Sequence, residues 1–425
     1  MGFALVAVAV LALLAAVHRY VWRRFVGDTT KAGSPLRRAG TVAAYVLPLL
    51  SVGALVSGRT GAPFWLQQVL AWPGYLWLAA LLYLTLALLA GELVRPLLRR
   101  LLARRAAASP AEAAREPEAV SAEPAPAAHA SALTTAAPPT PAPLAATPAA
   151  APSRRLFVAR AVGGAAAVAG LGTTGYGAYG VLRGPRVKRV TVPLARLPRS
   201  AHGFRIAVVS DIHLGPVLGR AHTQRIVDTV NRTQPDLIAV VGDLVDGSVA
   251  DLGRAAEPLA RLRSRHGAFF VTGNHEYYSG AAEWVDHVRE LGLHPLENAR
   301  VEIDGFDLAG VNDIAGESEG QGPDFGRALG DRDRHRAAVL MAHQPVVIDE
   351  AVEHGVDLQL SGHTHGGQLW PGNYIAELSN PTVAGLERYG DTQLYVTRGA
   401  GAWGPPVRVG APSDITVVEL ASRRA

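Results

Sequence analysis

The distribution of hydrophobic positions divides the chain into an apolar amino-terminal part and a patterned carboxyl-terminal part. Three runs without a charged residue lie in a membrane region at 1–105, at about 2–17, 41–57 and 69–91. Each run approaches the ~20 apolar residues that a helix needs to cross a bilayer. The pattern predicts three transmembrane helices, because three buried core helices in such close succession would be unusual.

A fourth apolar segment, 156–182, has Arg160 as its one charged residue and is rich in small residues that suit helix contacts within lipid. We expect a fourth transmembrane helix there. Arg154 and Arg155 precede its apolar run, which resembles a twin-arginine export signal, although ordinary basic flanking explains them equally well. The run at 2–17 lacks a preceding basic residue and a clear cleavage motif, so we interpret it as a retained anchor rather than a signal peptide.

Basic residues around the apolar runs indicate which ends face the cytoplasm. The loop at 18–40 is rich in Lys and Arg, whereas the next loop carries only Arg59. Because cytoplasmic loops are enriched in basic residues, this first loop and the basic stretch at 95–105 should face the cytoplasm. A fourth crossing then delivers the remainder of the chain to the extracytoplasmic face. The basic residues at 183–189 argue for the opposite orientation.

The composition changes at 106–155, where Pro and Ala dominate. Such a composition cannot bury a core, so we expect a disordered linker. A globular domain is expected over 190–425. Its apolar runs predict buried strands at 205–210, 237–242, 268–273, 338–343 and 358–363. Helical patterns lie between them at 220–233 and 281–291. Alternating strands and helices indicate an α/β layered domain, in which ligands gather beyond the carboxyl ends of strands.

Residues of metal-binding types follow all five predicted strands: Asp211 and His213; Asp243 and Asp246; Asn274 and His275; His343; His363 and His365. Side chains two positions apart in extended chain point the same way, so Asp211 can act with His213, and His363 with His365. The absence of cysteine excludes thiolate catalysis and thiolate metal ligands. The net charge of +5 comes mostly from arginine beside the apolar runs and does not indicate nucleic-acid binding.

The order of these motifs resembles the calcineurin-like metallophosphoesterase family. "SDIH", "VGDLVD", "TGNHE", "MAHQP" and "SGHTHGGQ" match its five blocks. "GHTHGGQ" and the later "VTRGAGAWGPPVR" are similar to the membrane-associated bacterial subgroup. The resemblance covers about 203–421. It implies a layered α-β-β-α metallophosphoesterase domain, here preceded by transmembrane helices.

The resemblance also implies a centre of two divalent ions and the roles of its residues. Its implied ligands are Asp211, His213 and His365 for one ion, Asn274, His343 and His363 for the other, and Asp243 as the bridge. Carboxylate, amide and imidazole ligands without sulfur suit Mn, Fe or Zn. The implied catalytic residues are His275, as proton donor to the leaving oxygen, and Asp246, which orients it.

Three acidic positions and a neighbouring Asn have structural alternatives. A turn-capping role explains Asp246 nearly as well. Glu276 fills the acidic position of the signature, where a structural role is at least as good an explanation as a catalytic one. Asn312 and Asp313 either line the mouth of the site or form a turn, and we favour the turn.

These features lead us to expect a membrane-anchored, binuclear metal-dependent phosphohydrolase that cleaves phosphomonoesters or phosphodiesters with a metal-bridging hydroxide as nucleophile. Attachment to the membrane favours a phosphorylated lipid or an envelope phosphodiester as the substrate. A soluble nucleotide is the open alternative. We expect a multi-pass cell-membrane protein with an extracytoplasmic catalytic domain. The alternatives are a membrane sensor or scaffold that binds a phosphorylated ligand without turnover, and a transporter. His275 beside a complete ligand set favours catalysis, and spans without ionisable residues disfavour transport.

Overall fold

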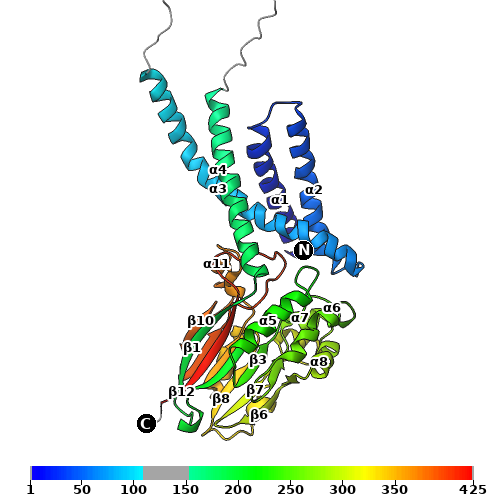
Figure 1. Cartoon of the computed structure of the whole chain (residues 1–425), viewed down its shortest axis with the longest axis vertical. Helices are drawn as coiled ribbons and strands as arrows, with labels where there is room; N and C mark the ends of the chain where they lie inside the picture. The colour runs from blue at the N-terminus through cyan, green and yellow to red at the C-terminus, as the bar shows by residue number, and fades with distance from the viewer. Residues whose placement is uncertain (1, 109–152, 424–425) are drawn as a thin grey trace, which may run out of the picture.

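The computed structural model describes residues 2–108 and 153–423, with a helical region at one end and a β-sheet domain at the other (Figure 1). The expected linker at 106–155 lies almost wholly outside the described residues. The helical region consists of α1 (Gly2–Trp22), α2 (Pro35–Ser57), α3 (Phe64–Ala108) and α4 (Arg154–Leu182).

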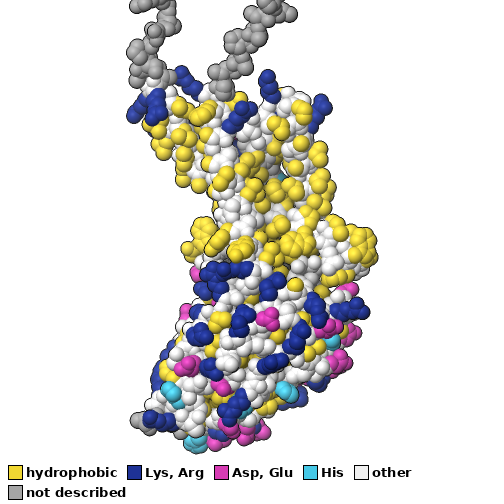
Figure 2. All heavy atoms as spheres, in the orientation of Figure 1, with side chains coloured by type: hydrophobic (Ala, Val, Ile, Leu, Met, Phe, Trp, Pro, Cys, Tyr) yellow, Lys and Arg dark blue, Asp and Glu magenta, His cyan; other side chains and the backbone are white. Residues whose placement is uncertain are grey.

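Among the described residues, α2, α3 and α4 contain segments long and apolar enough to cross a membrane, at Pro35–Ser57, Phe64–Arg105 and Arg154–Leu182. Apolar side chains cover the outside of this region (Figure 2). The runs expected to span the bilayer lie within α1, α2, α3 and α4 in that order. α3 extends beyond its apolar run and includes the basic stretch at 95–105.

Small residues let α3 and α4 approach each other closely. A Cβ on Gly170 of α4 would lie 2.8 Å from the backbone nitrogen of Leu84 in α3, and a Cβ on Gly91 of α3 would lie 2.6 Å from Cγ1 of Val162 in α4. Close backbone approach of this kind is how helices associate where apolar burial offers little driving force. The small residues at 156–182 therefore serve as a contact surface.

The domain contains two six-stranded sheets. In spatial order, the first consists of β1 (Arg186–Leu194), β12 (Asp414–Ser422), β2 (Phe204–Val209), β3 (Leu237–Val241), β4 (Ala268–Val271) and β5 (His294–Pro295). The second consists of β10 (Gly385–Tyr389), β11 (Thr392–Val396), β9 (Leu358–Ser361), β8 (Ala337–Met341), β7 (Phe306–Gly310) and β6 (Ala299–Ile303). Side chains from both sheets, such as Ile206 and Phe306, share one buried core.

Helices cover the outer faces of both sheets. On the first sheet lie α5 (Arg220–Arg232), α6 (Val249–Ala256) and α8 (Ala281–Glu290), and on the second lie α9 (Phe325–Leu329) and α10 (Ile348–Glu353). The short helices α7 (Asn274–Ser279) and α11 (Asn373–Ala376) follow β4 and β9. This α-β-β-α layering confirms the predicted fold class. The five predicted strands form β2, β3, β4, β8 and β9, and the two predicted helices form α5 and α8.

Strand direction places the loops of interest beside the helical region. β1 begins at Arg186, shortly after α4 ends at Leu182. β12 runs parallel to β1, and β2 runs antiparallel to β12. β2, together with β3 and β4 parallel to it, therefore ends at the edge where β1 begins. The loops that carry the candidate metal ligands consequently lie beneath the helices (Figure 1).

Candidate metal centre

The candidate ligands lie at or just beyond the carboxyl ends of β2, β3, β4, β8 and β9. Five of them adopt positive φ: Asp211 (53°), His213 (49°), Asp243 (52°), His363 (71°) and His365 (53°). Residues other than glycine rarely adopt this conformation, and backbone strain of this kind gathers at functional sites. The local conformation is thus consistent with loops shaped for a ligand.

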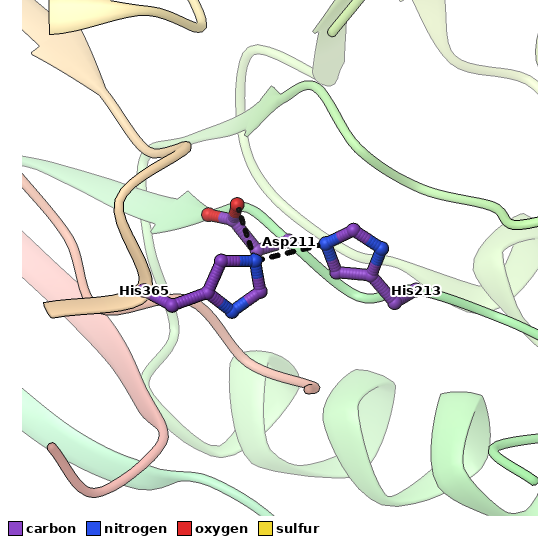
Figure 3. Close-up of side chains that lie close together, drawn as sticks. All are labelled: Asp211, His213 and His365. Atoms are coloured by element: carbon purple, nitrogen blue, oxygen red, sulfur yellow. Dashed lines mark hydrogen bonds and ion pairs between the residues drawn. The ribbon is translucent and has the colours of Figure 1, made fainter. Parts of the chain in front are cut away.

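The first group of potential ligands consists of Asp211, His213 and His365, whose side chains point toward one another (Figure 3). Nε2 of His213 lies 3.0 Å from Nε2 of His365, and the latter atom lies 3.3 Å from Oδ1 of Asp211. Metal–ligand bonds of about 2.0–2.2 Å place neighbouring ligand atoms about 3 Å apart. The observed spacing therefore suits a shared cation.

The second group consists of Asp243, His343 and His363. Nε2 of His343 lies 3.1 Å from Oδ2 of Asp243, while Nε2 of His213 from the first group lies 3.7 Å from the same oxygen. Oδ1 of Asn274 lies 3.0 Å from Nδ1 of His363 and joins this group. One oxygen of Asp243 thus lies within 3.7 Å of a histidine from each group.

The protonation of His343 tests whether these residues fit a cation. Its Nδ1–H donates to the carbonyl of Val241 at 2.9 Å, and its buried Nε2 lies within ion-pair distance of Oδ2 of Asp243 but makes no well-aligned hydrogen bond among the described residues. A metal-binding histidine commonly donates its other N–H to a carbonyl in this way. Burial lowers the pKa of His343, but Asp243 and Asp211 raise it well above its ordinary value. A proton therefore occupies this nitrogen unless a cation replaces it, and the residues present fit such an ion.

Asp246 contacts two histidines through one oxygen. Its Oδ1 accepts from Nδ1 of His213 at 3.0 Å and from Nδ1 of His275 at 2.6 Å. Burial raises the pKa of Asp246, but His213 and His275 lower it to about 2. Burial lowers the pKa of His213, but attraction to Asp246 and two further carboxylates raises it to about 9. The carboxylate therefore orients both a candidate metal ligand and the candidate proton donor.

Glu276, Asp313 and Asn312 lie in structural positions. The carboxylate of Glu276 accepts from the backbone N–H groups of Asp243 and Gly273, at 3.0 and 2.6 Å, and so ties two loops of the centre together. Asp313 accepts from the backbone of Ala315 at 2.9 Å at the start of a 3-10 turn. Asn312 donates to a backbone carbonyl close by. Both lie in the turn that the sequence favours.

Glycines allow the carboxylates to lie directly against backbone. A Cβ on Gly273 would collide with Oδ1 of Asp243, and one on Gly362 would collide with Oδ2 of Asp211. Gly399 has φ of 83°, and its Cβ would lie 2.5 Å from Cβ of Asp211. Gly399 comes from the loop after β11, within the "VTRGAGAWGPPVR" stretch, whose resemblance to the family carries no assignment to the site.

The same loop supplies Arg408, a buried residue that the sequence analysis misses. Its Nη1 donates to the carbonyl of His365 at 3.0 Å, and its Nη2 lies 3.0 Å from Nδ1 of the same residue. Burial lowers the pKa of Arg408 to about 10, which leaves it charged at neutral pH. The signal available in the sequence is the place of Arg408 as the last residue of "VTRGAGAWGPPVR", the stretch that resembles the membrane-associated subgroup.

Comparisons with known proteins identify relatives of this chain. A profile of the calcineurin-like phosphoesterase family matches residues 204–367. A protein of Aquifex aeolicus named "Uncharacterized metallophosphoesterase" is 35% identical over 240 residues, which cover 55% of this chain and 91% of that protein. The chain belongs to the calcineurin-like phosphoesterase family. The matched residues of this chain include every candidate ligand. Membership of the family confirms the resemblance on which the sequence motifs were assigned.

Two vertebrate relatives of this chain are named "Transmembrane protein with metallophosphoesterase domain". The protein of Danio rerio is 39% identical over 58% of this chain, and that of Bos taurus is 40% identical over 56%. The matches span 59% and 57% of those proteins. Among solved structures, the phosphopantetheinyl hydrolase of Mycobacterium tuberculosis has 13% identity, covers 46% of this chain and 88% of its own, and has a TM-score of 0.29. That score is too low to carry an argument.

Proposed function

We propose that this chain is a membrane-anchored phosphoesterase that hydrolyses phosphomonoester or phosphodiester bonds with the help of two divalent cations. The observation that carries the proposal is the convergence of two ligand groups on one oxygen of Asp243, with His275 beside them. Family membership supports metal-dependent hydrolysis as the reaction. The donor set admits Mn, Fe or Zn.

Two bound cations would activate water and offset the charge that develops on the phosphoryl group. The contribution of the chain is to hold the ligands in place and to move a proton. One ion would be held by Asp211, His213 and His365. The other would be held by Asn274, His343 and His363, and the carboxylate of Asp243 would contact both. His275 keeps its Nδ1 on Asp246, so Nε2 is the atom that delivers a proton to the leaving oxygen.

The helical region would anchor this domain as a multi-pass protein of the cell membrane, with the domain on the extracytoplasmic face. The loop between α1 and α2 and the carboxyl end of α3 lie at the end of the helices away from the domain (Figure 1), where Lys and Arg are visible in Figure 2. Basic residues gather on the cytoplasmic side of membrane proteins, which supports this orientation. A domain held at the membrane favours a phosphorylated lipid or envelope phosphodiester as substrate.

Hydrolysis of aryl phosphomonoesters and phosphodiesters by the full chain in lipid nanodiscs, with manganese or with chelator, tests the proposal. We expect manganese-dependent turnover. His275→Ala should keep its manganese content and lose about 10²–10⁴-fold in kcat, the usual contribution of a general acid. His335→Ala, which changes an exposed histidine, is the control. Equal inactivity of the parent with manganese and with chelator would favour the scaffold alternative, and an unchanged rate in His275→Ala would remove its role.

A further inference from the structure

The edge of the domain that carries the metal centre is docked against the helices. Oη of Tyr83 in α3 donates to the carbonyl of Trp370 at 3.1 Å. Val181 of α4 forms a buried cluster with Leu218 and Ala402, which lie on loops of this edge. Tyr83 and Val181 belong to helices apolar enough to cross a membrane. Val181 is the penultimate residue of α4, so the edge lies at the end of that helix, and the bond from Tyr83 holds it beside the apolar run of α3.

An apolar surface borders this junction. Trp370, Tyr374, Ile375 and Leu378, on and beside α11, are all exposed, and Ile375 and Leu378 reach 71% and 86%. We call these four residues the α11 patch. The bond from Tyr83 joins the patch to α3, and Leu369, next to Trp370, pairs with Val409, which lies against Gly177 of α4. Large apolar side chains exposed together mark an interaction surface.

The surroundings of the α11 patch match a lipid surface. Figure 2 shows that the apolar surface of the helices continues to the domain edge and that Lys and Arg begin directly below it. Arg183, Arg186 and Arg189 follow α4 and are exposed. Apolar and aromatic side chains bordered by basic ones are typical of a protein at the headgroup level of a bilayer. These features favour lipid rather than a soluble protein as the partner of the α11 patch.

Exposed aromatic side chains also surround the candidate proton donor, and one of them is joined to the segment that carries the α11 patch. The ring of His275 lies 5.4 Å from that of Tyr278 and 5.7 Å from that of Trp403, and both aromatic residues are exposed. The backbone of Trp403 donates to Oε1 of Gln368 at 3.0 Å, and Nε2 of Gln368 donates back to its carbonyl at 2.9 Å. Gln368 is two residues from Trp370. The exposed aromatic residue Trp403, which contacts His275, is therefore tied to the segment that leads into the patch.

We infer that the substrate is a bilayer-resident phospholipid whose phosphoester head group reaches the metal centre from the membrane surface, and that the α11 patch inserts into the lipid beside this route. The substrate class rests on the proposed function, since it needs a hydrolytic centre. Water adds to phosphorus as the P–O bond to the departing alcohol breaks, and the oxygen of that alcohol takes the proton of His275 beside Tyr278 and Trp403. The acyl chains remain in the bilayer next to α3 and α4.

Site-specific labelling tests the insertion without reference to activity. The chain has no cysteine, so Leu378→Cys provides a single position for an environment-sensitive fluorophore. Asp391→Cys, in the fully exposed turn between β10 and β11, is the control. In vesicles that contain brominated phosphatidylcholine and phosphatidylglycerol, the label at 378 should be blue-shifted and quenched, and the label at 391 should not. Equal, weak quenching at both positions would overturn the insertion.

Hydrolysis of matched substrates tests the substrate class. The probes are dioleoyl phosphatidic acid and phosphatidylglycerol in vesicles, their dibutyryl forms in solution, and an aryl phosphate. The double variant Ile375→Ser/Leu378→Ser should lose at least about tenfold in kcat/KM on the vesicle lipids, since two lipid-facing apolar groups are removed. Its rate on the aryl phosphate should not change. Leu386→Ser, on β10 outside the patch, should resemble the parent on every probe.

The two ways to fail are distinguishable. If the aryl phosphate is hydrolysed while the dioleoyl lipids are no better than their dibutyryl forms, the lipid inference is overturned and the proposed function stands. If no probe is hydrolysed, the proposed function and the substrate class fail together, and the labelling result still decides whether the α11 patch enters lipid.

Discussion

The backbone N–H of Arg408 donates to the carbonyl of Gly177 in α4 at 3.3 Å, and the side chain of the same arginine contacts His365. A Cβ on Gly177 would lie 2.7 Å from Cγ1 of Val407 and 2.9 Å from the carbonyl oxygen of Arg408. A helix of the membrane region therefore contacts the backbone of the residue that supports a candidate metal ligand. The position of α4 and the geometry of the centre should depend on each other.

Gly177→Leu tests this dependence. The added side chain has no room against Val407 and Arg408, so it should shift the loop and weaken manganese binding by about 10-fold, the lower range for altered support of a ligand. Gly180→Leu, on the same helix with open space around its Cβ, is the matched control. Titration calorimetry of the nanodisc-embedded chain measures both. Equal affinity in the two variants would argue against the coupling.

Arg408→Met should weaken manganese binding by about 10–100-fold, because it removes the donors that fix the backbone and ring of His365. Arg408→Lys should recover only part of the loss, since an ammonium cannot reproduce the planar guanidinium. Arg388→Met, at an exposed position on β10, controls for loss of an arginine. A folded Arg408→Met protein with parental affinity, as judged by its melting curve and titration, would show that the contact is incidental.

Asp246→Asn should lower kcat strongly, because the same oxygen orients His213 and His275. If Asp246 acts through His275, its effect should largely disappear in the His275→Ala background, since residues that work as a unit are not additive. A double-mutant cycle on the aryl phosphate measures the coupling. Asp228→Asn on the exposed face of α5 is the control. Additive losses in the cycle would assign Asp246 to metal binding alone.

Manganese affinity should rise with pH. The pKa of His213 is about 9 without a cation, against an ordinary value of 6.5, so at neutral pH binding must displace its proton. The association constant should therefore increase by up to about tenfold per pH unit for each proton released, between about pH 6 and about pH 8. Calorimetry in buffers of different ionisation enthalpy counts those protons. Asp246→Asn removes the main attraction and should release fewer protons, whereas a pH-independent parental affinity would contradict the assignment of His213 as a ligand.

Gly362→Ala should displace Asp211, because the new methyl group would collide with Oδ2 of that carboxylate. We expect weaker manganese binding and a stability loss of about 1–3 kcal/mol, the usual cost of overpacking. Gly219→Ala, where the Cβ would meet open space, is the control. Thermal melts with and without manganese measure both effects. A Gly362→Ala protein that gains as much stability from manganese as the parent would show that the loop can relax.

The central strands and the convergence of their loops follow from the sequence for a simple physical reason. Uninterrupted apolar runs such as 237–242 predict buried strands, and parallel strands bring their carboxyl ends to one edge. Asp243 and His343, which lie in different sheets, still meet because the two sheets share one core. Alternation within each motif then predicts which side chains can act together.

Other parts of the site depend on contacts that no local pattern encodes. Arg408 lies 43 positions after His365, and its role depends on the path of the loop after β11. The docking of α4 through Gly177 requires tertiary geometry, because a glycine in an apolar helix is equally compatible with facing lipid. α11 is too short for an amphipathic period to reveal it, so the α11 patch emerges only from exposure in the folded chain.

The docking of the helices on the edge that carries the candidate metal centre also affects how this protein should be purified. A soluble fragment cut near Arg186 would leave Leu218 and Ala402 without Val181 and would free the backbone of Arg408 from Gly177. The apolar side chains of Leu218 and Ala402 would then be exposed to water next to the ligand loops. Such a truncated fragment should aggregate and bind metal weakly. The intact chain in a lipid nanodisc keeps α4 packed over the ligand loops.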